Sequence, residues 1–223
     1  SVSEAGFGRV SCTVPELPDI VAYTEALGRH VVGWPLSALR ISSPFLVRSV
    51  EPPVAEFVGH AVTGIERIGK RIVLRFAAER FLVIHLMIAG RLRWRAPKGK
   101  VPGRGALAVF EFPNGWLFFT EAGTKKRASL TAVEGRAALA AIDRGGLEPL
   151  EATRDAFGER LLSENHTLKR SLTDPRLFSG IGNAYSDEIL HHARLSPLKT
   201  TARLTDAEID ALFASTGSVL RWW

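Results

Sequence analysis

The run Pro15-Glu16-Leu17-Pro18 places a proline nitrogen directly beside a carboxylate. If the chain began at Pro15, its terminal amine would have an ordinary pKa of roughly 7.7–8.0, so much of it would be unprotonated near neutral pH. Such an amine could attack an aldehyde-level carbon such as a deoxyribose C1′ and form a Schiff base. Glu16 could donate or accept the protons that this step needs. The simpler interpretation of these four residues is that they begin a helix.

Two further segments carry groups that could bind an anion. Lys70 lies in Gly69-Lys70-Arg71, at an expected turn between strands, where it could reach a phosphate, pair with a carboxylate or simply face solvent. The segment from Asp174 to Tyr185 is a glycine-flanked turn that leads into a helix. Backbone N–H groups at such a helix start attract phosphates, and the candidates here are Gly182, Asn183 and the upstream Lys169.

The chain is basic, with a formal net charge of +6 over 223 residues. Six of its 29 lysines and arginines form two groups in expected loops, where they could meet phosphates without disturbing the core. A solvated surface is the alternative for either group. The first group is Lys98, Lys100 and Arg104, and the second is Lys125, Lys126 and Arg127.

The elements that must position these residues fall into two regions. A helix is expected from Pro18 to Leu27, followed by short runs of alternating or apolar residues separated by turns. In one of these runs, 71–76, Ile72, Leu74 and Phe76 face inward and Val73 faces outward with the two arginines. The expected strands without intervening helices predict a β-sandwich or barrel; they are 36–42, 61–68, 71–76, 81–86, 91–95, 106–112 and 116–120, with a hairpin turn at 113–115.

The pattern becomes helical after about residue 132. Residues 133–143 are rich in alanine, and Ile181, Tyr185, Ile189 and Ala193 repeat at the spacing of one helix face. Thr205-Asp206-Ala207-Glu208 is a capping box that opens a last helix. We therefore expect an α+β protein with a leader or added extension at 1–14, a β-sandwich domain with an N-terminal helix at 15–132 and a helical domain at 133–223.

Composition narrows the class of protein. An apolar content of 46% argues against disorder, and no apolar run reaches the ~20 residues that span a bilayer. One cysteine allows neither an internal disulfide nor a cysteine-based metal site. With no recognisable targeting segment, a cytoplasmic protein that does not act at membranes is expected.

In combination, these motifs resemble the formamidopyrimidine-DNA glycosylase and endonuclease VIII family. The similarity runs in order from the signature Pro15–Asp19, through His85-Leu86 with Gly90 and Leu92-Arg93, to the Gly180–Tyr185 segment, which resembles the family's helix–two-turn–helix motif. The resemblance implies a base-excision repair enzyme of the nucleoid, a monomer that acts on damaged double-stranded DNA as glycosylase and abasic-site lyase. Because a base inside the stack is inaccessible, such an enzyme must extrude it.

The resemblance also implies roles for individual residues. Pro15 would be the Schiff-base nucleophile, Glu16 the acid that assists sugar-ring opening, and Lys70 the lysine near the lesion. Lys169 and Asn183 would hold the flanking phosphates. Ile88 stands where well-known members have a methionine that fills the gap left by the extruded base, and an apolar wedge is still sensible there.

Several residues depart from the family's pattern. Val14 occupies the position of the initiator methionine and caps Pro15 as an amide, so we expect a natural chain that begins at Pro15. Asp19 and Val21 replace common glutamates, and Arg127 replaces a phenylalanine wedge. The family normally continues into a zinc-finger hairpin. A single cysteine cannot form such a finger, so we expect no cofactor in this chain. Zinc is expected only if a longer form carries that hairpin.

Two other functions remain open from the sequence. One is an abasic-site lyase that does not remove bases efficiently. The other is a non-catalytic nucleic-acid-binding protein, because helix–two-turn–helix elements also occur in ribosomal proteins. Pro15, Glu16 and Lys70 separate these possibilities, since a protein that only binds nucleic acid does not need them.

Overall fold

The computed structural model describes residues 14–97, 106–122 and 124–221. Most of the expected leader and the loop with Lys98, Lys100 and Arg104 therefore lie outside the described residues. The chain divides into two compact units. The first contains Pro15 and Asp19–Ile142, and the second contains Glu16–Pro18 with the described residues from Asp143 onward.

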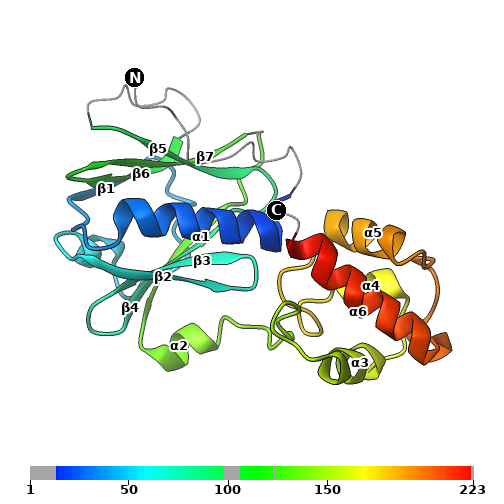
Figure 1. Cartoon of the computed structure of the whole chain (residues 1–223). Helices are drawn as coiled ribbons and strands as arrows, with labels where there is room; N and C mark the ends of the chain where they lie inside the picture. Colours follow the sequence, from blue (N-terminus) through cyan, green and yellow to red (C-terminus); the bar gives the residue numbers. More distant parts are fainter. Residues whose placement is uncertain (1–13, 98–105, 123, 222–223) are drawn as a thin grey trace. The chain divides into compact units, whose positions relative to one another are not determined.

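The first unit is a sandwich of two antiparallel four-stranded sheets with a helix packed against its core. The expected α+β class, with a β-sandwich followed by helices, is confirmed (Figure 1). One sheet has the order β1 (Ala38–Ile41), β6 (Ala106–Phe112), β7 (Gly115–Glu121) and β5 (Gly90–Arg95). The other has the order β2 (Val62–Ile68), β3 (Arg71–Phe76), β4 (Arg80–His85) and β8 (Ser129–Glu134).

The inner face of β3 follows the alternation that the sequence predicted. Ile72, Leu74 and Phe76 of β3 lie in the main core with residues of β6 and β7. The prediction that Val73 faces solvent is wrong, because Val73 is fully buried. Its face of the sheet carries a second apolar cluster, in which Leu139 of α2 (Arg136–Ala140) packs with Val73 and Phe81. A strand whose two faces are both covered loses the simple inside–outside pattern.

The strand β8 was not expected from the sequence. Residues 133–143 were predicted to be helical, but Val133 and Glu134 end β8, and the helix α2 is short. Because α2 packs on the sheet, the division between the units falls after Ile142 rather than after residue 132. Local alanine content favoured a helix, whereas pairing of β8 with β4 decides the structure.

The N-terminal helix α1 (Leu17–Val31) is one residue longer at its start and four longer at its end than predicted. Ile20, Tyr23, Leu27 and Val31 recur at helical spacing and are buried in the main core. Figure 1 draws the helix between the two sheets. The helix begins with residues of the second unit and continues in the first, so Pro15 and Glu16 directly precede an element held by packing.

The second unit is helical. It contains α3 (Arg154–Leu162), α4 (Leu168–Thr173), α5 (Asn183–His192) and α6 (Asp206–Arg221). Phe157 packs against Phe178 and Phe213, with ring centroids 4.7 and 5.5 Å away. The capping box of α6 is confirmed, because the Thr205 N–H donates to the Glu208 carboxylate (2.9 Å) and the Glu208 N–H donates to Thr205 Oγ1 (3.3 Å).

The predicted apolar face of α5 is only partly correct. The helix begins at Asn183, so Ile181 precedes it, and the buried face consists of Ser186, Ile189 and Leu190. A repeat of four residues predicts that a helix has an apolar face, but it does not show where the helix begins or which neighbouring positions are buried. None of the helices in the described part of the chain is long and apolar enough to cross a membrane.

Candidate active site and nucleic-acid interface

Glu16 is buried, with 1% of its surface exposed, and its carboxylate lies at the start of α5. One oxygen accepts hydrogen bonds from the N–H groups of Gly182 (2.6 Å) and Tyr185 (3.2 Å), and the other from that of Ala184 (2.9 Å). The first N–H groups of a helix have no partners within the helix and form its positive end. Three such donors stabilise an ionised carboxylate and fix its position.

This contact changes the interpretation of the glycine-flanked turn. The sequence suggested that the backbone N–H of Gly182 binds a phosphate, but in the structure that N–H donates to Glu16. The anion at the start of α5 is thus a side chain of the protein itself. A carboxylate 166 residues away in sequence cannot be found as a cap by local pattern, although the excess of donors at this helix start is visible in the sequence.

Gly180 brings the start of α1 to the same turn. Its carbonyl oxygen accepts a hydrogen bond from the Leu17 N–H (2.9 Å), and its φ of +79° is a conformation that favours glycine. A Cβ at Gly180 would lie 2.9 Å from Leu17 Cβ. The backbone on the C-terminal side of Glu16 is therefore held as firmly as its carboxylate, and Pro15 is bonded to a residue with little freedom.

The predicted phosphate ligands Lys169 and Asn183 lie on neighbouring helices. Asn183 is the first residue of α5 and is exposed. The Lys169 ammonium forms an ion pair with Asp187, one turn further along α5. Asn183 and Asp187 are four residues apart and so share a helix face. The structure thus joins Lys169 to the face of α5 that carries Asn183, and their roles toward phosphate stay predictions.

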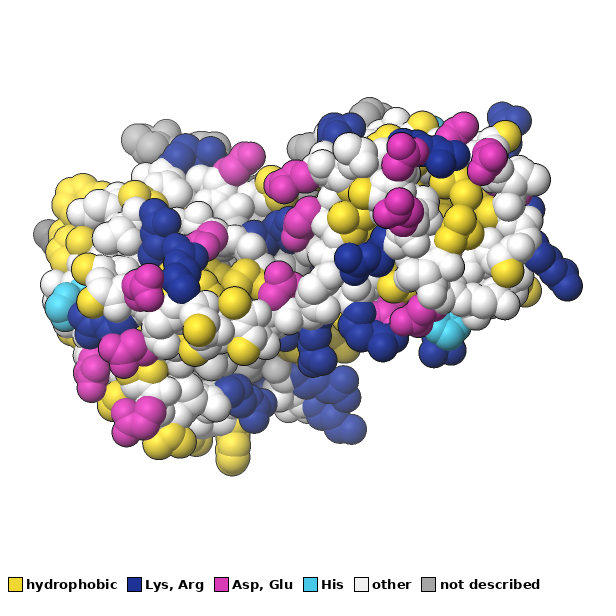
Figure 2. Space-filling model, turned by 90° about the horizontal axis from the view of Figure 1, so that it is seen from below, with side chains coloured by type: hydrophobic (Ala, Val, Ile, Leu, Met, Phe, Trp, Pro, Cys, Tyr) yellow, Lys and Arg dark blue, Asp and Glu magenta, His cyan; other side chains and the backbone are white. Residues whose placement is uncertain are grey.

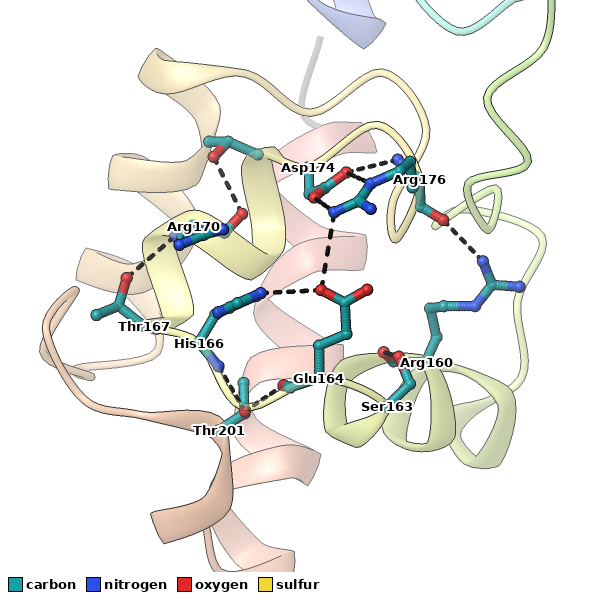
Figure 3. A network of polar contacts seen from close by, with 10 residues as sticks. Arg160, Ser163, Glu164, His166, Thr167, Arg170, Asp174, Arg176 and Thr201 are labelled. Carbon is teal, nitrogen blue, oxygen red and sulfur yellow. Dashed lines mark hydrogen bonds and ion pairs between the residues drawn. The ribbon is translucent and has the colours of Figure 1, made fainter.

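A polar network holds the segment between α4 and α5 (Figure 3). The Arg176 guanidinium donates two hydrogen bonds to the Asp174 carboxylate (3.1 and 2.6 Å), and this contact lowers the pKa of Asp174. Glu164 lies 3.7 Å from Arg176 and 2.9 Å from His166, and Arg160 donates to the Arg176 carbonyl oxygen (2.8 Å). Arg176 therefore braces the turn that leads to the α5 start.

In the sandwich unit, strand register brings three predicted site segments and His85 to one end. Arg71, which follows the Lys70 turn, pairs with His85, and His85 pairs with Ser129. Gly90, which ends the turn with Ile88, pairs with Glu121. β4 is followed by β5 of the other sheet, and β7 by β8 of the other sheet, so the chain passes between the sheets twice at this end. Lys70, His85, Ile88 and the basic run 125–127 belong to one region of the unit.

His85 was part of the family resemblance but was not among the predicted site residues. Burial, reinforced by the positive charges of Arg71 and Lys70, lowers the pKa of His85 from 6.5 to about 4. The imidazole is therefore neutral at neutral pH. A histidine within an apolar strand gives no such signal by itself, because its neighbours come from the strand register.

The lowered pKa of His85 predicts a dependence of stability on pH. Between pH 6.5 and 4 the unfolded chain binds a proton at this position and the folded chain does not, so stability falls as pH falls through this window. The pKa difference corresponds to roughly 3 kcal/mol at most. We expect His85→Gln to flatten the fall in the free energy of unfolding, measured by urea denaturation at several pH values. His191→Gln, at an exposed position, should leave the slope unchanged, and equal slopes for wild type and His85→Gln would contradict the assignment.

Ile88 lies at the tip of a tight turn and is 52% exposed. The turn is closed by a hydrogen bond from the Gly90 N–H to the Leu86 carbonyl oxygen (2.9 Å), and Met87 has a positive φ of 54°. The Arg91 guanidinium donates to the carbonyl oxygens of Ile88 (3.2 Å) and Gly90 (2.7 Å). An exposed apolar side chain on a braced turn fits the predicted wedge, which stays a prediction.

The side chains of Lys125, Lys126 and Arg127 are exposed, as a phosphate-binding loop requires. Lys126 donates a hydrogen bond from its ammonium to the Glu121 carbonyl oxygen. On the face shown in Figure 2, lysine and arginine side chains are interspersed with acidic ones. The positive net charge alone therefore does not outline an interface, and the placement of individual groups must define it.

The structure joins the predicted residues within each unit. Glu16 accepts a hydrogen bond from Gly182, the residue before Asn183. Lys70, Ile88 and the run 125–127 share one end of the sandwich. Within the described residues, no group of three or more histidine, cysteine, aspartate or glutamate side chains could hold a metal ion. The expectation of zinc concerns a segment beyond this chain and stays a prediction.

Comparison with known proteins covers both units. Residues 14–127 match the family model described as the formamidopyrimidine-DNA glycosylase N-terminal domain, and residues 146–222 match its H2TH domain. The formamidopyrimidine-DNA glycosylase of Roseiflexus sp. is 32% identical over 216 residues, which cover 93% of this chain and 77% of that protein. The protein of the same name from Pelotomaculum thermopropionicum is 28% identical over 215 residues, with the same coverage.

Solved structures show the same fold. The Lactococcus lactis formamidopyrimidine-DNA glycosylase bound non-covalently to DNA with an abasic site superposes with a TM-score of 0.83 at 23% identity, covering 92% of this chain and 80% of that one. A second complex of that glycosylase with abasic-site DNA gives a TM-score of 0.84 at 24% identity, covering 92% and 78%. The two family models match in order and together cover most of the chain, residues 14–127 and 146–222. The chain belongs to the formamidopyrimidine-DNA glycosylase family.

Proposed function

We propose that the protein is a DNA base-excision repair glycosylase with abasic-site lyase activity, which removes oxidised bases through a Schiff base on Pro15. The proposal rests on the buried Glu16 carboxylate, which is next to Pro15 in the chain and accepts hydrogen bonds from three N–H groups at the start of α5, those of Gly182, Ala184 and Tyr185. A buried carboxylate needs such partners, and here they hold it next to the one nitrogen that could serve as a terminal secondary amine.

The arrangement supports a specific order of proton transfers. The Pro15 amine forms a bond to C1′ of the sugar as the bond from C1′ to the base breaks, and the base leaves with the bonding pair and takes up a proton from water. The new N–H⁺ group passes its proton to the Glu16 carboxylate. Glu16 then returns the proton to the ring oxygen O4′ as the C1′–O4′ bond breaks, which leaves the iminium ion. Loss of a C2′ proton then expels the 3′ phosphate.

This chemistry requires a chain that begins at Pro15. With Val14 attached, the proline nitrogen is a tertiary amide without a nucleophilic lone pair. We propose that the natural chain starts at Pro15, and intact mass spectrometry of the natural protein tests this point. A mature terminus upstream of Pro15 would contradict it.

The other predicted residues serve the DNA in this proposal. Lys70 contacts a phosphate near the lesion, and Ile88 fills the gap left by the extruded base. The remaining candidates hold flanking phosphates and so help to offset the cost of unstacking; they are Lys125, Lys126, Arg127, Lys169 and Asn183. The substrate is double-stranded DNA bound by a single copy of the chain.

The direct test is borohydride trapping on a duplex with an abasic site. Protein that begins at Pro15 should form a covalent adduct between pH 6 and 8, seen as a band of lower mobility on a denaturing gel. The same protein with Val14 retained should form none, because its proline nitrogen is an amide. Absence of an adduct from both forms would favour a non-catalytic DNA-binding protein, and duplexes with oxidised bases would separate a glycosylase from a lyase alone.

A further inference from the structure

Glu121 is a buried carboxylate that the proposed mechanism does not use. Only 4% of its surface is exposed. Its two oxygens accept hydrogen bonds from the Arg127 N–H (3.0 Å to each) and the Ala128 N–H (3.2 and 3.3 Å). Burying a charge without partners is costly, and these two backbone groups supply the partners. The carboxylate thus binds the backbone at the end of the basic run 125–127.

These contacts fix Arg127 from inside the molecule. The N–H groups at residues 127 and 128 point toward the buried carboxylate, while the Arg127 side chain is exposed. The Lys126 ammonium group donates a hydrogen bond to the Glu121 carbonyl oxygen. Glu121 therefore holds this segment through two groups. Its carboxylate accepts hydrogen bonds from the N–H groups of residues 127 and 128, and its carbonyl oxygen accepts one from the ammonium group of residue 126.

The same residue ties this segment to the turn that carries Ile88. Glu121 pairs with Gly90, the residue that ends the turn, and the strands β5 and β7 lie side by side (Figure 1). The Ala122 N–H donates to the Ala89 carbonyl oxygen (3.4 Å). Gly90 cannot take a side chain, because a Cβ there would lie 2.3 Å from the Leu86 carbonyl oxygen. Glu121 and Ala122 are therefore held next to the turn that carries Ile88.

We propose that Glu121 is a positioning residue for DNA binding, which fixes the backbone of Arg127 before the duplex arrives. The proposal rests on the proposed function, since it assumes that this end of the sandwich meets DNA. A segment that is ordered before binding loses less conformational freedom when DNA binds. The protein therefore binds DNA more tightly than it would if this segment became ordered only on binding. Glu121 acts through the backbone of Arg127 and is not itself a DNA ligand.

A double-mutant cycle tests this mechanism, with the dissociation constant measured for a duplex that carries a tetrahydrofuran abasic analogue. We expect Glu121→Ala and Arg127→Ala each to weaken binding by about tenfold. The double variant should bind about as well as Arg127→Ala alone, because Glu121 acts through Arg127. A double variant weakened by the product of the two single effects would overturn the proposal.

Conservative variants separate positioning from general folding. Glutamine keeps a carbonyl oxygen that can accept from both N–H groups, so Glu121→Gln should retain most of the affinity. Aspartate is one methylene shorter, so Glu121→Asp should behave like Glu121→Ala, and this pair carries the test if the alanine variant fails to fold. Equal affinities of the Gln and Asp variants would contradict the proposal. Glu134→Ala, at an exposed position in β8, is the matched control and should bind as wild type does.

The two proposals can fail separately. Borohydride trapping by the wild-type chain that begins at Pro15 reports the chemistry, whereas the cycle reports coupling between Glu121 and Arg127. A trapped adduct with additive variants would overturn the role of Glu121 and leave the function intact. Coupling without any adduct would support Glu121 and contradict the lyase.

Discussion

Replacing Glu16 with glutamine is expected to slow Schiff-base formation by roughly 10²–10⁴-fold, the usual contribution of a positioned proton-transfer group. Glutamine retains one acceptor oxygen for the α5 N–H groups but cannot shuttle a proton between the Pro15 amine and O4′. The measurement is the single-turnover rate of borohydride-trapped adduct on abasic-site DNA. Loss of the charge-assisted hydrogen bonds should also lower stability by roughly 1.5–3 kcal/mol.

The control must show that the rate does not simply follow stability. Glu208→Gln is suitable, because Glu208 also accepts a hydrogen bond at a helix start, from the Thr205 N–H, but lies at α6 rather than beside Pro15. It also forms an ion pair with Lys199. We expect Glu208→Gln to lower the melting temperature without changing the trapping rate. If Glu16→Gln lowered the melting temperature alone, Glu16 would be only a helix cap.

Gly180→Ala is expected to destabilise the protein by about 2–4 kcal/mol. An alanine at a φ of +79° carries a backbone cost of about 1–2 kcal/mol, and its Cβ would press on Leu17. Because Leu17 adjoins Glu16, the trapping rate should fall as well. Urea denaturation gives the first effect and single-turnover trapping gives the second.

Gly158→Ala is the matched control for this prediction. Gly158 is buried within α3, but a Cβ there would meet Ile209 at 3.5 Å, an ordinary contact. Alanine favours a helix over glycine by about 1 kcal/mol, so this variant should be neutral or slightly stabilised. Equal stabilities of the two variants would show that the Gly180 turn is not strained against Leu17.

Local patterns predicted those parts of the fold whose neighbours are close in sequence. The alternation in β3, the hairpin between β6 and β7 and the capping box of α6 each depend on residues a few positions apart. The strand β8 depends on pairing with β4, some fifty residues earlier in the chain, and alanines beyond it suggested a helix instead. Val73 was misplaced for the same reason, since α2 covers its face of the sheet.

In the candidate site, too, the sequence revealed the residue types but not the contacts between distant residues. Its residue types were visible in the sequence, including Pro15, Glu16 and the glycines before α5. The partner of each carboxylate was not, because Glu16 caps a helix start more than 160 residues away and Glu121 accepts from N–H groups across a loop. Hydrogen bonds to the backbone of distant residues carry no sequence signature, since every residue except proline offers an N–H group.

We propose that the nucleophile is the Pro15 nitrogen, which the anchored Glu16 holds in place. The most direct measurement is mass spectrometry of a tryptic digest after borohydride trapping on abasic-site DNA, with protein that begins at Pro15. We predict that the sugar remnant is found on the peptide Pro15–Arg29, attached at its terminal nitrogen. A remnant attached to a lysine, such as Lys70, with the terminal peptide unmodified, would contradict the claim.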